Sequence, residues 1–221
     1  MVDEPAGLRL RAQGLLFDLD GVLVDSTAAV IEVWTRYAER HGLDPEQVLP
    51  QVHGRPAVET IRALTPHVDL DAESRRLEDA EVALAEAAEA LPGAGRVLAA
   101  LPPGSWTVAT SGTRRLATTR LRATGLPVPA SLVTADDVTR GKPDPEPYAL
   151  AAERLGVDPR RAVVFEDTPA GIAAGLAAGA EVLAVATTFP PQALAAARAV
   201  LESLAALEVV AEPGGALLLR A

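Results

Sequence analysis

Two aspartates one residue apart follow a short apolar segment near the start of the chain, in the run Gly14-Leu15-Leu16-Phe17-Asp18-Leu19-Asp20-Gly21. Alternation along an extended backbone places Asp18 and Asp20 on the same side. Two such carboxylates repel each other and are costly to desolvate without a cation. The pair therefore offers a nucleophile, an acid/base and a shared site for a divalent metal. An Asp-Gly sequence after a strand is also an ordinary turn, and this run alone leaves both interpretations open.

Three further polar motifs each follow an apolar segment or lie in a restricted loop. Ser111-Gly112-Thr113 could form an anion cradle of hydroxyls and backbone N–H groups. Serine and threonine are also ordinary helix caps, which is the alternative for this motif. Lys142 lies between Gly141 and Pro143, which restrict its backbone, and a lysine there suits a phosphate or a pair of carboxylates. Glu166 and Asp167 end another apolar strand, where capping of a helix dipole explains one carboxylate better than two.

These motifs fall at the carboxyl ends of predicted parallel strands, the edge at which open α/β sheets bind ligands. Several carboxylates at that edge favour a hard cation with oxygen ligands, and Mg²⁺ fits this description. A metal, a lysine and a cradle of hydroxyls together suit a compact anion such as phosphate.

Strand and helix patterns alternate along most of the chain, which predicts an α/β fold with a parallel sheet. Residues 26–90 contain helical patterns without a strand, including a helix that Ser26 can cap, one near 55–64 and one near 72–90. We therefore predict a core formed by residues 1–23 and 91–221, with residues 24–90 as a helical insertion. The other expected elements are strands at 106–110, 131–134, 162–165 and 181–185, helices at 114–124, 145–155 and 170–178, and a C-terminal pair of strands within 207–219.

The composition narrows the classes of partner. The chain has 221 residues, 49% of them hydrophobic, and a formal net charge of −10, which disfavours nucleic acids and anionic membranes as partners. The absence of cysteine excludes thiol chemistry and disulfides, and is compatible with a cytoplasmic location. No segment has the length and apolarity of a membrane span. We expect a monomer or small homo-oligomer that binds a small molecule.

The four motifs, in this order and with a helical block after the first, resemble the haloacid dehalogenase (HAD) superfamily over nearly the whole chain. The presence of the second acid, Asp20, resembles the pattern of the phosphatase and phosphomutase branch of that superfamily. Val52-His53-Gly54-Arg55 and the run from Phe165 to Gly175 look like those of glycerol-phosphate and sugar-phosphate phosphatases. The resemblance implies a Rossmann-like core with an inserted all-helical cap, as in the β-phosphoglucomutase-like group, and a Mg²⁺-dependent hydrolase of small phosphorylated metabolites.

The resemblance also implies a role for each matching residue. Asp18 would form an aspartyl-phosphate, Asp20 would act as general acid and base, and Lys142 would offset the charge of the transferring group. The Mg²⁺ would be bound by Asp18, Asp20 through its backbone carbonyl, and Asp167, with Glu166 in or near its shell. Substrate binding is expected from the remaining residues of the matching motifs: Ser111, Gly112, Thr113, His53 and Arg55.

Two alternatives to a plain phosphatase remain. A sugar phosphomutase would need a second phosphate site, for which β-phosphoglucomutase uses a histidine and an arginine in its cap. The corresponding positions here are Val30 and Ala57, which favours hydrolysis, while a different register would let Arg55 partly substitute. A non-catalytic phosphate-binding module is the other alternative, and the intact set of motifs argues against it. Arg55 could also simply lie in a solvated turn.

Overall fold

The computed structural model describes residues 7–52, 54–212 and 214–221. Its central sheet has five parallel strands in the order β5-β2-β6-β7-β8. The strands are β2 (Gly14–Phe17), β5 (Trp106–Val108), β6 (Ala162–Glu166), β7 (Glu181–Val185) and β8 (Ala199–Leu201). β2, β5 and β6 are buried throughout, as expected for parallel strands covered on both faces. The predicted α/β fold with a parallel sheet is therefore confirmed.

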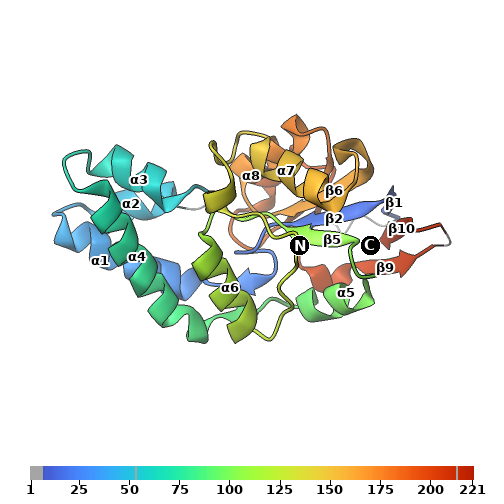
Figure 1. Ribbon diagram of the computed structural model, residues 1–221, viewed down its shortest axis with the longest axis horizontal. Helices are drawn as coiled ribbons and strands as arrows, with labels where there is room; N and C mark the ends of the chain where they lie inside the picture. The colour runs from blue at the N-terminus through green and yellow to red at the C-terminus, as the bar shows by residue number, and fades with distance from the viewer. Residues whose placement is uncertain (1–6, 53, 213) are drawn as a thin grey trace.

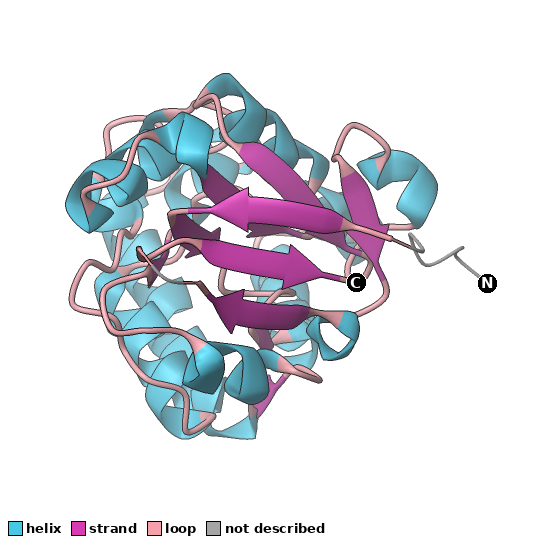
Figure 2. Ribbon diagram, turned by 90° about the vertical axis from the view of Figure 1, so that its right-hand side faces the viewer, coloured by secondary structure: helices cyan, strands magenta, loops and turns pink. Residues whose placement is uncertain are grey.

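Helices cover both faces of this sheet (Figure 1). On one face, α5 (Ala94–Ala100) and α6 (Arg114–Ala123) contribute Val97, Leu98 and Leu121 to the larger hydrophobic core. On the other face, α7 (Glu146–Leu155) and α8 (Pro169–Ala177) contribute Tyr148 and Ile172 to a second core. Figure 2 shows the strands at the centre with helices outside them. Short 3-10 helices complete the connections: η3 (Ala135–Asp137), η4 (Pro159–Arg161), η5 (Pro191–Leu194) and η6 (Leu204–Ala206).

A helical segment, residues 26–88, lies at one end of the molecule (Figure 1). It enters through β3 (Val24–Asp25) and leaves through β4 (Glu89–Ala90), which pair with each other antiparallel. Trp34 and Tyr37 anchor a hydrophobic core of its own. Its helices are α1 (Thr27–Arg40), α2 (Pro45–Val48), η1 (Leu49–Gln51), α3 (Ala57–Leu64), α4 (Leu70–Leu84) and η2 (Ala85–Ala87).

The structure corrects several expected elements. The helix expected near 72–90 ends at Leu84, and residues 89–90 form β4, so a short strand does end the helical segment. Residues 131–134 are not a strand and contribute only a bridge between Val133 and Ala109. β1 (Arg9–Ala12), β8 and α5 were not predicted from the sequence.

The expected C-terminal strands are confirmed as β9 (Glu208–Ala211) and β10 (Leu217–Arg220), and β1 joins them in a separate antiparallel sheet. Leu217 and Leu219 of β10 pack into the larger core. None of the helices in the described part of the chain has the length and apolarity that crossing a membrane would require.

Candidate active site

The carboxyl ends of β2 and β6 bring the two acidic motifs together. These strands are adjacent and in register, with Phe17 opposite Phe165. Asp18 and Glu166 therefore come from neighbouring strands, and the backbone N–H of Asp18 donates to the carbonyl of Phe165 at 2.9 Å. Asp18, Glu166 and Asp167 are all buried, and one carboxylate oxygen of each lies within 4.8 Å of the others. The sheet thus concentrates negative charge in a place that water reaches poorly.

Lys142 supplies the cation at the centre of this acidic group. Its Nζ donates to Oδ1 of Asp18 and to Oε1 of Glu166, each at 2.6 Å. The ammonium also lies 4.8 Å from the ring centroid of Tyr148 on α7. Lys142 is the only lysine in the chain and is 2% exposed. Burial alone would lower the pKa of Lys142, but the two carboxylates raise it, so this side chain is a permanent positive charge.

Glu166 is fully occupied by protein donors. Its Oε1 also accepts from the hydroxyl of Tyr148 at 2.8 Å. Its Oε2 accepts from the backbone N–H groups of Asp167 and Thr168 and from the Thr168 hydroxyl, at 2.9–3.0 Å. Burial opposes ionisation of Glu166, but Lys142 and these donors hold its pKa below the ordinary value. Glu166 is therefore a fixed anion that orients Lys142.

Asp18 and Asp167 are in a different electrostatic position. Burial raises the pKa of Asp18 to about 7 against the opposing effect of Lys142. Burial, together with the charges of Glu166 and Asp18, raises the pKa of Asp167 well above its ordinary value. Oδ1 of Asp167 is buried and lacks a hydrogen-bond partner among the described residues. Two oxygen donors with excess negative charge and an unpartnered atom fit a divalent cation.

Gly21 allows Asp167 to approach the first motif closely. Its φ is +80°, and a Cβ on Gly21 would lie 2.0 Å from Oδ2 of Asp167. Gly171 of α8 has the same function for Glu166, because a Cβ there would lie 1.7 Å from Oε1 of Glu166. Glycine is therefore required at both positions, because any side chain there would collide with a carboxylate of the site.

Asp20 points toward the helical segment. Its Oδ1 accepts from the hydroxyl of Ser26 at 2.7 Å, and its Oδ2 accepts from Nη1 of Arg120 on α6 at 3.0 Å. The expectation that the Ser26 side chain caps α1 is therefore wrong, although Ser26 does occupy the N-cap position. The hydroxyl is instead used to hold Asp20.

The predicted anion cradle is only partly open to a ligand. Ser111 and Gly112 line the cavity described below, but the Gly112 N–H donates to the Thr110 hydroxyl at 3.1 Å. The Thr113 hydroxyl accepts from the Leu116 N–H as the N-cap of α6 and also donates to Glu78 of α4. Thr113 is thus in contact with the helical segment, and it is absent from the cavity lining among the described residues.

The turn between η1 and α3 reaches from the helical segment to the core. The Ser111 hydroxyl donates to the carbonyl of Gly54 at 3.3 Å. Gly54 has φ +77°, and a Cβ there would lie 2.9 Å from Oγ1 of Thr168. Arg55 is exposed and lines the cavity. His53 lies outside the described residues.

A cavity of about 100 Å³ lies between the two parts of the molecule. Val30 and Ala57, the two positions that the resemblance to β-phosphoglucomutase singled out, line this cavity and are apolar. Lys142 and Glu166 lie behind it. The lining comprises Asp18, Asp20, Gly21, Ser26, Thr27, Val30, Trp34, Val52, Gly54, Arg55, Ala57, Glu81, Thr110, Ser111, Gly112, Leu116, Arg120, Asp167, Thr168 and Thr188.

Tyr148, Glu81 and Arg120 lie at this site but were not predicted from the sequence as functional residues. Tyr148 sits on the buried face of α7, where an aromatic residue reads as ordinary core. Glu81 and Arg120 lie within helices whose other charges are mostly solvent-facing, and no local motif distinguishes them. The only available signal was that Arg120 falls on the apolar face of α6, in phase with Leu116 and Ala117.

Comparisons with known proteins agree with this geometry. A model of the haloacid dehalogenase-like hydrolases matches residues 12–179. Hexitol phosphatase A of Escherichia coli (strain K12) is 44% identical over 93% of this chain and 98% of its own length. Glycerol-1-phosphate phosphohydrolase 2 of Saccharomyces cerevisiae is 38% identical over 82% of this chain and 78% of its own length.

Among solved structures, a HAD family hydrolase from Deinococcus radiodurans R1, with bound phosphate and sodium, is 31% identical with a TM-score of 0.65. That alignment covers 88% of this chain and 92% of the other. The match of the family model spans the two acidic motifs, the hydroxyl motif and Lys142, which the fold assembles at one edge of the sheet. The chain therefore belongs to the haloacid dehalogenase-like hydrolase family.

Proposed function

We propose that the protein is a Mg²⁺-dependent phosphatase that hydrolyses a small sugar or polyol phosphate through a phosphorylated Asp18. The observation that carries this proposal is the buried Lys142, which lies 2.6 Å from both Asp18 and Glu166. A cation fixed beside a carboxylate at the floor of a cavity allows that carboxylate to meet an anionic phosphate.

The donor set supports Mg²⁺ as the metal. Asp18 and Asp167 would hold the ion, together with the backbone carbonyl of Asp20. Glu166 would contribute to metal binding only indirectly, because both of its carboxylate oxygens already accept hydrogen bonds from the protein. When bound, the metal supplies charge neutralisation between Asp18 and the phosphoryl oxygens.

Two chemical steps follow from the positions of Asp18 and Asp20. In the first, a carboxylate oxygen of Asp18 attacks phosphorus, the ester P–O bond breaks, and Asp20 gives a proton to the leaving alkoxide. In the second, Asp20 takes a proton from water as the water attacks phosphorus, which releases phosphate and restores Asp18. Lys142 offsets the charge of the transferring group, and Ser111 donates to its oxygens.

Residues 24–90 would act as a cap over this site, with hinges near Val24–Asp25 and Leu91–Gly93. The pairing of β3 with β4 brings both connections together, and Gly54 already touches Thr168 and Ser111 across the cavity. Such a cap would exclude water during the first step and admit it for the second.

The substrate class is inferred from the relatives and from the cavity. Hexitol and glycerol phosphates are linear and hydroxyl-rich, and the cavity carries Ser26, Thr27 and Arg55 along its cap side. The apolar Val30 and Ala57 supply no donor to a second phosphate, which supports hydrolysis over a mutase reaction.

The test is a panel of hexitol phosphates, glycerol 1-phosphate, hexose phosphates and nucleoside monophosphates, assayed for phosphate release and for isomer formation. We expect phosphate release from the linear polyol phosphates, without isomers, that EDTA abolishes and Mg²⁺ restores. Asp18→Asn is nearly isosteric and should remove turnover while the circular dichroism spectrum is retained. Isomer formation would favour the mutase. If wild type binds phosphate but neither turns over any ester nor forms a phosphorylated Asp18, the protein is a non-catalytic binding module.

A further inference from the structure

Arg120 is a buried arginine whose donors are only partly used. It lies on α6 and is 3% exposed. Its Nη1 donates to Oδ2 of Asp20 at 3.0 Å, while its Nε and Nη2 have no hydrogen-bond partner among the described residues. Unpaired buried donors on a charged group are costly, so this guanidinium is placed to donate to a second carboxylate.

Glu81 is the carboxylate on the other side of Arg120. It belongs to α4 of the helical segment, and its Oε1 lies 3.8 Å from Nη2 of Arg120. Glu81 is also buried, and burial raises its pKa to about 7 while Arg120 opposes the shift. Arg120 therefore lies between one acid of the core, Asp20, and one acid of the helical segment.

The two ends of this arrangement have different hydrogen-bonding states. Asp20 has both oxygens engaged, one by Ser26 and one by Arg120. Glu81 is beyond hydrogen-bond distance from Arg120, and a separation of about 3.0 Å would make that bond. A small displacement of α4 toward α6 would bring Glu81 to the unpaired Nη2, while Nη1 continues to donate to Asp20.

We propose that Arg120 is a positioning residue for Asp20, and that Glu81 holds the guanidinium in place through its second terminal nitrogen, Nη2. This rests on the proposed function, in which Asp20 protonates the leaving oxygen. Approach of the helical segment brings Glu81 to Nη2 of Arg120, so the guanidinium spans both acids and orients Asp20 as the substrate becomes enclosed.

Glu81→Gln tests this role with little change in size. The neutral amide is a weaker acceptor for a guanidinium, so Arg120 should be held less firmly and Asp20 should be positioned less well. We expect single-turnover phosphorylation of Asp18 by a hexitol phosphate to slow about tenfold, within the range that general acid catalysis contributes. The same step with p-nitrophenyl phosphate should change less than about twofold, because nitrophenolate leaves without a proton.

Arg115→Met is the matched control. Arg115 also lies on α6 and joins it to α4, through Asp79 and Glu78, but it does not contact Asp20 among the described residues. The Arg115→Met substitution removes a comparable link between the two parts of the molecule. It should therefore change the rates for both substrates by the same factor. If Glu81→Gln also slows both substrates equally, the residue is merely structural and the proposal is overturned.

A double-mutant cycle establishes that Glu81 acts through Arg120. In the Arg120→Lys background, the ammonium is too compact to span both carboxylates, so adding Glu81→Gln should change the substrate ratio less than about twofold. Arg120→Met serves as a second background if circular dichroism shows that it folds. An undiminished effect of Glu81→Gln in the Arg120→Lys background would overturn the coupling. Failure of the proposed function is distinguishable, because wild type would then hydrolyse neither substrate.

Discussion

Oδ1 of Asp18 and Nζ of Lys142 lie 2.6 Å apart, although 124 residues separate them along the chain. Both groups are buried, and Glu166 lies on the other side of the same ammonium. This group of two acids and one cation carries an excess negative charge that a metal would neutralise. The chemistry and the stability of this site therefore depend on the same few contacts.

Lys142→Met should impair both catalysis and stability. It leaves Asp18 and Glu166 without their cation, and removal of one partner of a buried ion pair costs about 3–5 kcal/mol. We expect the phosphorylation rate of Asp18 to fall about a hundredfold or more. Urea unfolding and single-turnover kinetics measure the two effects. Tyr148→Phe is the control, because it removes one hydrogen bond from Glu166 and keeps the ion pairs. A wild-type rate in Lys142→Met would contradict the role of this residue.

Gly171→Ala should disrupt the site by displacing the Glu166 carboxylate. A Cβ at this position would lie 1.7 Å from Oε1 of Glu166, so the carboxylate and Lys142 must both shift. We expect the free energy of unfolding to fall by about 1–3 kcal/mol and activity to fall with it. Gly95→Ala on α5 is the matched control, since the nearest atom to its Cβ is 3.9 Å away. Equal behaviour of the two alanine variants in thermal unfolding and phosphatase assays would rule out this packing argument.

The stabilisation by Mg²⁺ should increase with pH. Burial raises the pKa of Asp18 from 3.8 to about 7 and raises that of Asp167 in the same direction. Between about pH 4 and 7 the folded state thus holds more protons on Asp18 than the unfolded state. This contribution to stability is present at low pH and lost as the pH rises through 7. Above that pH the acids are charged and available to a cation.

Melting temperatures with and without Mg²⁺, at pH 5.5 and pH 8, check this prediction. We expect the larger upward shift at pH 8, because metal binding no longer has to displace protons. In Asp167→Asn, the metal-free protein should be more stable than wild type at pH 8, and the response to Mg²⁺ should be small. A shift that is independent of pH in wild type would mean that these acids do not bind the ion.

Arg55→Ala should weaken binding of the physiological substrate. Arg55 is exposed, lines the cavity and lies in a chain of net charge −10, so it offers a cation where an anion enters. We expect KM for a hexitol or glycerol phosphate to rise about tenfold, as for loss of a charge-assisted hydrogen bond. KM for p-nitrophenyl phosphate should change less, because it has no hydroxyls for the cap to contact.

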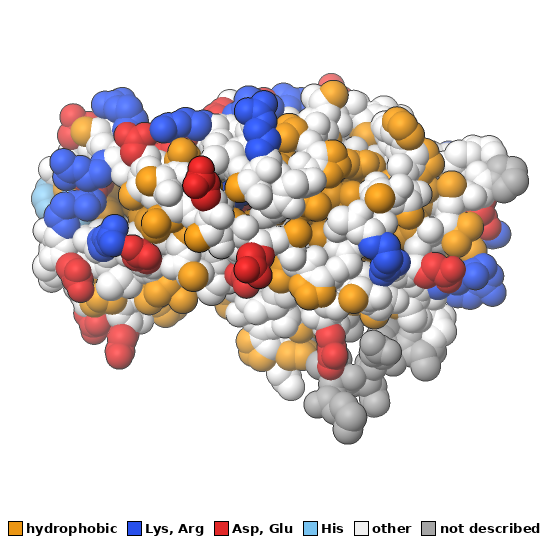
Figure 3. Space-filling model, turned by 90° about the horizontal axis from the view of Figure 1, so that it is seen from below, with side chains coloured by type: hydrophobic (Ala, Val, Ile, Leu, Met, Phe, Trp, Pro, Cys, Tyr) orange, Lys and Arg blue, Asp and Glu red, His pale blue; other side chains and the backbone are white. Residues whose placement is uncertain are grey.

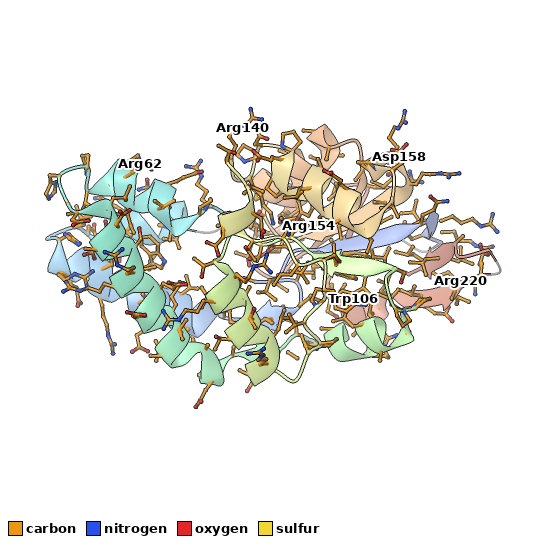
Figure 4. The ribbon with its side chains drawn as sticks, viewed as in Figure 1. Arg62, Trp106, Arg140, Arg154, Asp158 and Arg220 are labelled. Carbon is orange, nitrogen blue, oxygen red and sulfur yellow. The ribbon has the colours of Figure 1, made fainter. Side chains whose placement is uncertain are left out.

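Arg62→Ala controls for the loss of an arginine from the same segment. Arg62 lies on α3 at the far end of the helical segment and does not line the cavity (Figure 4). Figure 3 shows acidic and basic side chains interspersed at the helical end of the molecule, on the face seen from below. Because Arg62 does not line the cavity, its loss should not alter substrate entry. Identical kinetics of Arg55→Ala and wild type with every polyol phosphate would place specificity elsewhere.

Local sequence determined the strand ends and the residues that follow them. Buried parallel strands are continuous apolar runs, and Asp18, Ser111 and Glu166 could be placed at their ends because polar residues interrupt those runs abruptly. Helix boundaries beside glycine or proline were placed to within one residue: the helix expected over 170–178 begins at Pro169, and the helix expected over 145–155 ends before Gly156. Elements with weak apolar patterns were not predicted, so β1, which depends on β10 for its hydrogen bonds, was missed.

Tertiary structure alone decided which polar groups meet. The sequence shows Ser26 as a helix cap, but in the fold its hydroxyl donates to the Asp20 carboxylate at 2.7 Å, which makes a charge-assisted hydrogen bond. In the sequence, Arg120, Glu81 and Tyr148 look like ordinary helical residues. Only the packing of α4, α6 and α7 around the sheet edge brings them to the acids. Buried charges are stable only where a partner is positioned in three dimensions, and such partners come from distant segments of the chain.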